Sequence, residues 1–294
     1  MTPSRAPHQR SRSRAAPAYA SLRYAFPEFP IDPGPATQRV TVAVNDRGGG
    51  RPVLLLHGVG GTSLVWTRTQ EALTAAGFRS LAWDMPGYGH SPPLPAPSFA
   101  AWADAVIGVL DARGIDAADI VGYSLGGMVA IEAALRHPAR IRRLVLTGTS
   151  DRFSGRDPAW TARYVADRLV PLEAGMSMPQ VAARSIPDLL GDDPDDEAGP
   201  TATQAMAAIP KDVHRATMLQ MTSFDRAADL PAIAHRTLLI AGGRDTLVGP
   251  SVMGRMARAM PQARFVELPT AGHLSFLEQP AAFQAHLLAF LSPP

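Results

Sequence analysis

The sequence predicts an α/β fold built on a mostly parallel sheet with helices on both faces. Strand-like apolar runs alternate with helical patterns along most of the chain, as is typical of parallel βαβ units. The segment "PVLLLHG" (52–58) is a continuous apolar run that ends in glycine, as expected of a strand buried on both faces. The alternation stops at residues 151–235, where short helical patterns replace it. The chain is therefore predicted to have a two-part core with a helical insertion.

The predicted elements follow one another in a regular order. Seven runs are interpreted as strands, at residues 39–44, 52–58, 78–84, 119–124, 143–148, 237–243 and 264–269. Helical patterns follow them at residues 62–76, 99–110, 125–137, 250–260 and 276–291. Ligands of such sheets bind beyond the carboxyl ends of the strands, so the polar residues and glycines after each run are the candidate site residues.

The insertion is predicted to be a helical cap. It covers residues 151–235 and separates the core segments 38–150 and 236–294. Its helical patterns lie around residues 160–169, 180–190 and 203–221, and the acidic loop "GDDPDDEAGP" (191–200) divides it. Five methionines fall in this segment: Met176, Met178, Met206, Met218 and Met221. Methionine is flexible enough to fill gaps in a core or to adapt to apolar substrates.

The composition excludes several kinds of site. The 294 residues include no cysteine, which rules out disulfides, thiolate metal sites and a cysteine nucleophile. Hydrophobic residues make up 46% of the chain and charged residues 18%, which favours a substantial core over general disorder. No apolar run approaches the length that crosses a bilayer.

Residues 1–37 are predicted to be a disordered tail that is basic and rich in proline and arginine. Residues 1–27 carry five arginines and no acid, whereas the whole chain has a net charge of only +2. The folded part is therefore not basic, and nucleic-acid binding is not expected of it. The tail lacks the apolar stretch of a secretory signal, so a cytoplasmic protein is expected. Import into an organelle is the alternative, because the tail's arginine and serine content is similar to that of transit peptides.

Ser124 is the candidate nucleophile. The segment Gly122–Gly126, "GYSLG", fits the pattern G-x-S-x-G and lies between a predicted strand and a predicted helix, which is the context this pattern requires. In such a turn the serine hydroxyl projects above the sheet, and the helix that follows brings its positive end to the place where an oxyanion forms. The alternative interpretation is that Ser124 only caps the helix.

A serine nucleophile needs a base, and the base needs a carboxylate that orients it. His273 is the candidate base, because it follows the last predicted strand and so lies at the same edge of the sheet as Ser124. Asp245 follows the strand before that and is the candidate acid, with Asp84 and Asp151 as competitors. The two oxyanion donors are expected to be the backbone N–H groups of Leu125 and Val59, with Gly60 as the alternative to Val59.

Five motifs in order resemble those of the α/β-hydrolase family: "LLLHGVGG", "DMPGYGHS", "GYSLGG", "LLIAGGRDTLV" and "AGHLSFLEQP". The resemblance runs from about residue 39 to the C-terminus. It implies an eight-stranded, mostly parallel sheet with a helical cap inserted after the sixth strand, and the catalytic triad Ser124, Asp245 and His273. It also implies that "DMPGYGHS" is a structural turn. Dehalogenases and epoxide hydrolases of the family carry aspartate where this chain has Ser124, which argues against both activities.

Within that family the chain is similar to enol-lactonase-like and carboxylesterase-like members. The predicted function is cleavage of an ester or lactone of a small, mainly apolar carboxylic substrate through an acyl-enzyme, with no metal or cofactor and no nucleic-acid or membrane partner. One alternative is a C–C bond hydrolase of ring-cleavage dienones, and another is a receptor-like protein that binds a small molecule. An enol-lactonase must bind a substrate carboxylate, for which Arg152, Arg156 and Arg163 are candidates.

Overall fold

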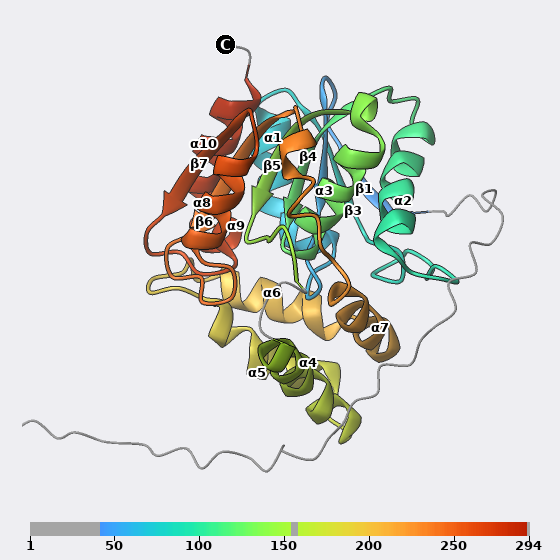
Figure 1. The fold of residues 1–294 in the computed structure, drawn as a ribbon, viewed down its shortest axis with the longest axis vertical. Helices are drawn as coiled ribbons and strands as arrows, with labels where there is room; N and C mark the ends of the chain where they lie inside the picture. Colours follow the sequence, from blue (N-terminus) through green and yellow to red (C-terminus); the bar gives the residue numbers. More distant parts are fainter. Residues whose placement is uncertain (1–41, 154–157, 293–294) are drawn as a thin grey trace, which may run out of the picture. The chain divides into compact units, whose positions relative to one another are not determined.

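The computed structural model describes residues 42–153 and 158–292, which form one sheet with helices packed around it (Figure 1). The strands are β1 (Val44–Arg47), β2 (Pro52–Leu56), β3 (Arg79–Trp83), β4 (Ala118–Tyr123), β5 (Ile141–Thr147), β6 (Arg236–Gly242) and β7 (Ala263–Leu268). Their order is β1-β3-β2-β4-β5-β6-β7, and only β1 runs antiparallel to its neighbour in this described sheet. The predicted α/β fold is confirmed.

The described sheet has seven strands where the family resemblance implies eight. The helical insertion therefore follows the fifth described strand and not the sixth. The predicted strand at 39–44 lies partly outside the described residues, and β1 begins only at its last residue, Val44. The ladder pairs Val44 with Trp83, the last residue of β3. One residue before Val44, the Ala43 N–H donates to the Ser91 hydroxyl at 2.8 Å. This N–H group is therefore bonded to a side chain and not to a neighbouring strand.

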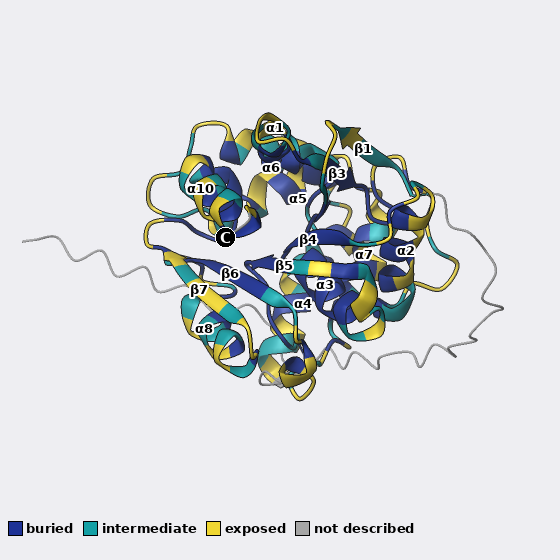
Figure 2. Cartoon of the chain, turned by 90° about the horizontal axis from the view of Figure 1, so that it is seen from above, coloured by how far each residue is buried: buried dark blue, intermediate teal, exposed yellow. Residues whose placement is uncertain are grey.

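Helices cover both faces of the sheet, as predicted. Helices α1 and α10 lie on one face, and α2, α3 and α8 lie on the other (Figure 2). The core helices are α1 (Thr67–Ala75), α2 (Phe99–Asp111), α3 (Leu125–Arg136), α8 (Pro250–Ala259), α9 (Ser275–Glu278) and α10 (Pro280–Leu291), with the short 3-10 turns η1 (Ser63–Trp66), η2 (Pro138–Arg140) and η4 (Leu230–Ala232). None of the described helices is both long and apolar enough for a membrane span.

The remaining helices form one group at one end of the strands (Figure 1). They are α4 (Pro158–Glu173), α5 (Met178–Ser185), η3 (Pro187–Leu189), α6 (Ala198–Ala207) and α7 (Lys211–Met221). We call residues 158–221 the helical insert. The helical pattern at 203–221 belongs to two helices, because Pro210 has no N–H to continue a helix and instead precedes the first residue of α7.

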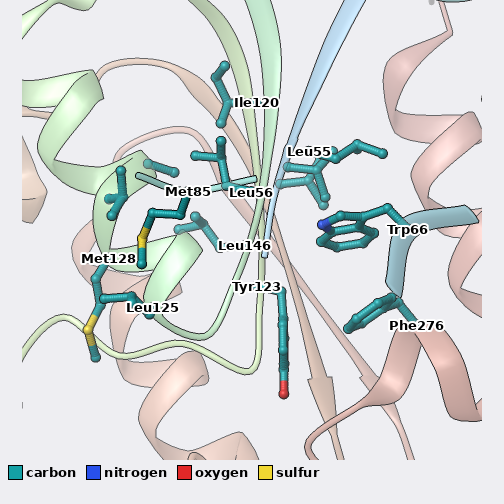
Figure 3. Close-up of a cluster of buried hydrophobic side chains, with 14 of the residues drawn as sticks. Leu55, Leu56, Trp66, Met85, Ile120, Tyr123, Leu125, Met128, Leu146 and Phe276 are labelled. Carbon is teal, nitrogen blue, oxygen red and sulfur yellow. The ribbon is translucent and has the colours of Figure 1, made fainter. Parts of the chain in front are cut away.

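The core extends up to the candidate serine. Figure 3 shows Trp66 and Phe276 on one side of the central strands, and Leu125 and Met128 on the other. The rings of Trp66 and Phe276 stack with centroids 4.2 Å apart, and Phe276 also packs on Tyr123 at 4.9 Å. Tyr123 directly precedes Ser124 and is 5% exposed. Close packing of large side chains therefore fixes the backbone that carries the hydroxyl.

Candidate active site

Ser124 occupies the sharp turn between β4 and α3. Its φ is 52° and its ψ is −119°, and it is the only non-glycine residue with a positive φ in the described part of the chain. Such a conformation costs about 1–3 kcal/mol and persists only where the surroundings impose it. Gly122 and Gly126 permit the turn: a Cβ on Gly122 would lie 2.5 Å from the Gly126 carbonyl oxygen, and one on Gly126 would lie 2.6 Å from that of His57.

The backbone of Ser124 is held on both sides while its hydroxyl is left for other contacts. The Ser124 N–H donates to the Thr147 carbonyl at 3.0 Å, and the Thr149 hydroxyl donates to the Ser124 carbonyl at 2.7 Å. Ser124 precedes the first residue of α3, yet its side chain makes no capping hydrogen bond. The helix-cap interpretation is therefore wrong for the hydroxyl, although the residue does stand at the cap position.

Ser124, His273 and Asp245 form one hydrogen-bonded series. His273 Nε2 lies 3.2 Å from Ser124 Oγ, and His273 Nδ1 lies 2.8 Å from Asp245 Oδ2. The three residues come from the loops after β4, β7 and β6, and their exposed fractions are 9%, 3% and 6%. Gly148, with a φ of +53°, leaves room for the imidazole, because a Cβ there would lie 3.2 Å from His273 Nδ1 and Cε1.

Asp245 is held as an anion. Its Oδ1 accepts the N–H groups of Leu247 and Val248, both at 2.8 Å, while Oδ2 faces His273. Burial raises the pKa of Asp245, but the charge and hydrogen bond of His273 and the two N–H groups outweigh this effect. The pKa of the carboxyl consequently lies below its ordinary value. A carboxylate in this place can orient the imidazole and stabilise its cation.

The competing acids lie elsewhere. Asp151 is 3% exposed and bonds Arg255 at 3.2 Å, and no hydrogen bond joins it to His273 within the described residues. Asp84 accepts the N–H groups of Ser63 and His90 at 2.8 and 3.1 Å. Its carboxylate therefore stabilises the turn "DMPGYGHS" and joins it to η1. Of the other histidines, His137 contacts Asp104 at 2.8 Å at the end of α3, and His90 is exposed.

The loop His57–Gly61 passes beside the serine. A Cβ on Gly58 would lie 3.0 Å from Ser124 Cβ, so only glycine fits here. The structure gives the N–H groups of Val59 and Leu125 no acceptor among the described residues. Two unpaired amides next to one hydroxyl can receive the oxygen of a tetrahedral intermediate.

His57 orients this loop, a role that the sequence analysis did not assign to it. Its Nδ1 donates to the Gly58 carbonyl at 2.8 Å, and its Nε2 accepts the Met85 N–H at 3.0 Å. Burial lowers the pKa of His57 to about 4, so the ring is neutral near pH 7 and can fill both roles. The Gly58 carbonyl and the Val59 N–H belong to one trans peptide unit and point in opposite directions. His57 and the Gly61 N–H, which bonds the same carbonyl at 3.0 Å, thereby fix the direction of the Val59 N–H.

The helical insert covers these loops with apolar side chains. Met206 of α6 packs on Gly60, and Val213 of α7 would lie 3.0 Å from a Cβ on Gly87. His214, next to Val213, is 2% exposed. Neither of its ring nitrogens makes a hydrogen bond of normal geometry among the described residues, but the backbone of Val59 is close enough to act on the ring. Of the arginines considered for a substrate carboxylate, Arg152 lies 3.9 Å from Asp151, Arg163 is exposed, and Arg156 is outside the described residues.

Glu278 was also missed by the sequence analysis. It lies in the motif "AGHLSFLEQP", five residues after His273, and it is 3% exposed. The sequence signal that could have identified Glu278 is a carboxylate in an otherwise apolar run. No group of three or more histidine, aspartate or glutamate side chains in the described ranges is arranged to hold a metal ion.

Comparison with known proteins gives a consistent result. The profile of a family described as the alpha/beta hydrolase fold matches residues 51–280. The chain is 32% identical over 249 residues to RutD of Variovorax paradoxus, named as a carbamate hydrolase, covering 83% of this chain and 92% of that protein. It is 32% identical over 272 residues to a 2-hydroxymuconate semialdehyde hydrolase of Pseudomonas putida, covering 85% and 90%. A solved esterase of Thermogutta terrifontis superposes with a TM-score of 0.75 at 30% identity, covering 86% of this chain and 93% of that one.

Proposed function

The chain belongs to the alpha/beta hydrolase fold family, and from this premise we propose that it is a serine hydrolase of esters or lactones of small, mainly apolar carboxylic acids. One observation carries the proposal: a serine hydroxyl on a strained turn is joined through a buried imidazole to a buried carboxylate. A binding protein has no need of this series, whereas a serine nucleophile needs both partners.

The proposed reaction uses only groups of this chain and water. Ser124 Oγ attacks the substrate carbonyl carbon while His273 Nε2 accepts the hydroxyl proton. The oxyanion that forms accepts hydrogen bonds from the N–H groups of Leu125 and Val59. His273 then gives its proton to the leaving alkoxide oxygen, and the acyl group remains on Ser124. A water molecule, deprotonated by His273, attacks the acyl carbon, and His273 returns the proton to Ser124 Oγ as the acid is released.

We propose further that residues 151–235 act as a cap on a core made of residues 38–150 and 236–294. The contacts of Met206 with Gly60 and of Val213 with Gly87 support this division, because they bring the insert onto the candidate oxyanion loop at Gly60 and onto the turn "DMPGYGHS" at Gly87. The same apolar contacts support an apolar acyl or alcohol part in the substrate. Such a cover excludes water from the site. The hydrogen bonds that act on the oxyanion are stronger for that reason.

A second candidate is hydrolysis of a C–C bond in a ring-cleavage dienone. The relative named 2-hydroxymuconate semialdehyde hydrolase favours it, since 85% of this chain aligns with that protein. The two functions require the same three side chains and differ in the substrate that the insert admits. Substrate preference, and not the triad, must therefore decide between them.

The test is a substrate panel measured with the wild-type chain and with Ser124→Ala. The panel contains p-nitrophenyl esters of short acids, a simple lactone, an N-substituted carbamate and a ring-cleavage dienone. Multiple turnovers of the esters or the lactone, lost in Ser124→Ala, support the proposal. Fast turnover of the dienone with feeble ester turnover favours the C–C hydrolase. Labelling of Ser124 by a fluorophosphonate with no turnover of any substrate favours a receptor-like protein.

A further inference from the structure

Glu278 is a buried carboxylate that no step of the proposed reaction uses. Its side chain accepts three backbone N–H groups: Gly191 at 2.6 Å, Gly272 at 2.9 Å and Leu274 at 3.0 Å. In the described residues it forms no ion pair with lysine or arginine, unlike Glu132, whose buried carboxylate binds Arg226 at 2.7 and 3.2 Å. Burial of a carboxylate costs free energy unless other groups compensate it. At Glu278 three backbone N–H groups, and not a lysine or arginine, supply this compensation.

Two of the three donors lie on either side of His273. The Gly272 N–H precedes the histidine and the Leu274 N–H follows it, so the carboxylate holds the backbone at both neighbours of His273. The position of an imidazole follows from the position of its Cα, because side chains occupy a small set of rotamers. The distance from His273 Nε2 to Ser124 Oγ is already 3.2 Å, at the long end for a hydrogen bond. A small shift of this loop would break it.

The third donor belongs to the helical insert. Gly191 lies in the loop between η3 and α6, and this loop is bonded along its length to the loop that carries His273. The His273 N–H donates to the Leu189 carbonyl at 2.8 Å, and the Asp192 N–H donates to the Thr270 carbonyl at 3.0 Å. Contact is so close that a Cβ on Gly272 would lie 2.6 Å from the Gly191 nitrogen. We call residues 269–274, between β7 and α9, the histidine loop. Glu278 therefore joins the insert and the histidine loop into one unit.

The charge of Glu278 has a second consequence. Burial raises the pKa of Glu278 above its ordinary value, and the three N–H groups and the neighbouring His273 oppose that effect only in part. An anion near His273 favours the imidazolium that forms when the serine loses its proton. A neutral side chain of the same shape would keep part of the tie and lose this attraction.

We propose that Glu278 is a positioning residue for His273, which it holds within reach of Ser124 by tying the histidine loop to the docked insert. The inference rests on the proposed function for the role of His273. It adds that the insert is part of the reaction geometry on this side, through the loop 189–195, and is not only a cover.

The experiment compares Glu278→Gln with Glu132→Gln as the matched control. Both replace a buried glutamate by its amide, but in the described residues the carboxylate of Glu132 is hydrogen-bonded to Arg226 and not to the loop that carries His273. In Glu278→Gln we expect kcat for a p-nitrophenyl ester and the rate of fluorophosphonate labelling to fall about 10- to 100-fold, with little change in KM. The downfield NMR signal of the His273 Nδ1 proton should shift or broaden. Glu132→Gln should lose thermal stability, yet keep kcat and that signal.

A second variant covers the case in which Glu278→Gln does not fold. Gly191→Ala keeps the carboxylate but pushes the insert loop off the Thr270 carbonyl, so labelling should slow about 10-fold. The positioning role is wrong if folded Glu278→Gln is labelled at the wild-type rate with an unchanged NMR signal. It is also wrong if folded Gly191→Ala is labelled at the wild-type rate with an unchanged NMR signal. If the wild-type chain itself is not labelled, the proposed function fails instead, and the two failures are distinct.

Discussion

The carboxyl edge of the sheet and the helical insert bury polar groups in opposite ways. At the sheet edge every buried side chain of the candidate site is hydrogen-bonded: Ser124 to His273, His273 to Asp245, and Glu278 to three amides. In the insert the buried side chains are mainly apolar, and the imidazole of His214 makes no hydrogen bond of normal geometry among the described residues, although the backbone of Val59 acts on it. The difference indicates that the core side chains fix the reaction geometry. The helices of the insert contribute mainly shape, whereas its loop 189–195 is tied to the loop of His273 through Glu278.

The largest expected effect comes from the centre of the sheet edge. Ser124→Ala should lower kcat for a p-nitrophenyl ester by about 10³-fold or more, because nothing else in the series can form the acyl-enzyme. Thermal unfolding should change little, since alanine adopts the same turn and the hydroxyl makes no capping bond. Fluorophosphonate labelling that persists in this variant would contradict the assignment of the nucleophile.

Ser124→Gly tests whether the backbone turn at residue 124 is strained, through the stability of the variant. Glycine adopts a φ of 52° without steric cost, so this variant should be about 1 kcal/mol more stable than Ser124→Ala while being equally inactive. Denaturant unfolding of the two variants measures the difference. Equal stability would mean that the turn at Ser124 is not strained.

The next effect separates two buried aspartates at the same sheet edge. Asp245→Asn should lower kcat by about 10²- to 10⁴-fold with little change in KM, because an amide neither fixes the tautomer of His273 nor stabilises its cation. Asp151→Asn is the matched control and should leave kcat nearly unchanged, since Asp151 bonds Arg255 and not the histidine. The reverse ranking of the two variants would move the acid to the loop after β5.

Much of this edge could be predicted from the sequence, because parallel strands end on the same side of a sheet. Ser124, Asp245 and His273 each follow an apolar run, so their meeting follows from chain order and strand direction. The start of β1 could not be predicted in this way. Val40, Val42 and Val44 alternate equally well, whereas in the folded chain the ladder starts at the pair Val44 and Trp83.

Hydrogen bonds to backbone amides were the least predictable feature. Glu278 and His57 act on peptide groups at Gly191, Gly272, Leu274, Gly58 and Met85, and an amide looks the same at every position of a sequence. Only the folded chain reveals which amides converge on one side chain. For the same reason the environment of the His214 imidazole has no sequence signature.

A smaller effect is expected from His57, which acts through the peptide that carries the Val59 N–H. His57→Leu removes the donor to the Gly58 carbonyl and the acceptor of the Met85 N–H. Because the Gly61 N–H still bonds that carbonyl, we expect kcat to fall about 10- to 100-fold, less than for removal of an oxyanion donor itself. KM should change little, since the contact matters in the transition state. Wild-type kcat in a folded variant would mean that His57 only supports the fold.

The smallest effect tests the insert side of the comparison. His214→Leu applies the same substitution to a buried imidazole of α7. It should leave kcat nearly unchanged, whereas loss of kcat equal to that of His57→Leu would give helix α7 a share in the chemistry. His214→Leu replaces a buried imidazole that lacks a hydrogen bond of normal geometry by an apolar side chain. This removes a desolvation cost of about 1 kcal/mol or more, so the variant should be as stable as the wild type or more stable.

The pH dependence of unfolding gives that last prediction a second measurement. Burial lowers the pKa of His214 from 6.5 to about 4, helped by the charge of Arg168 and opposed by the backbone of Val59. The unfolded chain therefore binds a proton near pH 6.5 that the folded chain refuses until about pH 4, so stability is complete above pH 6.5 and declines as the pH falls through this window. His57 contributes in the same direction. His214→Leu should make the melting temperature fall less steeply between pH 6.5 and 4. An unchanged slope in His214→Leu would mean that this imidazole is hydrated or protonated in the folded state, and that the insert buries polar groups no differently from the sheet edge.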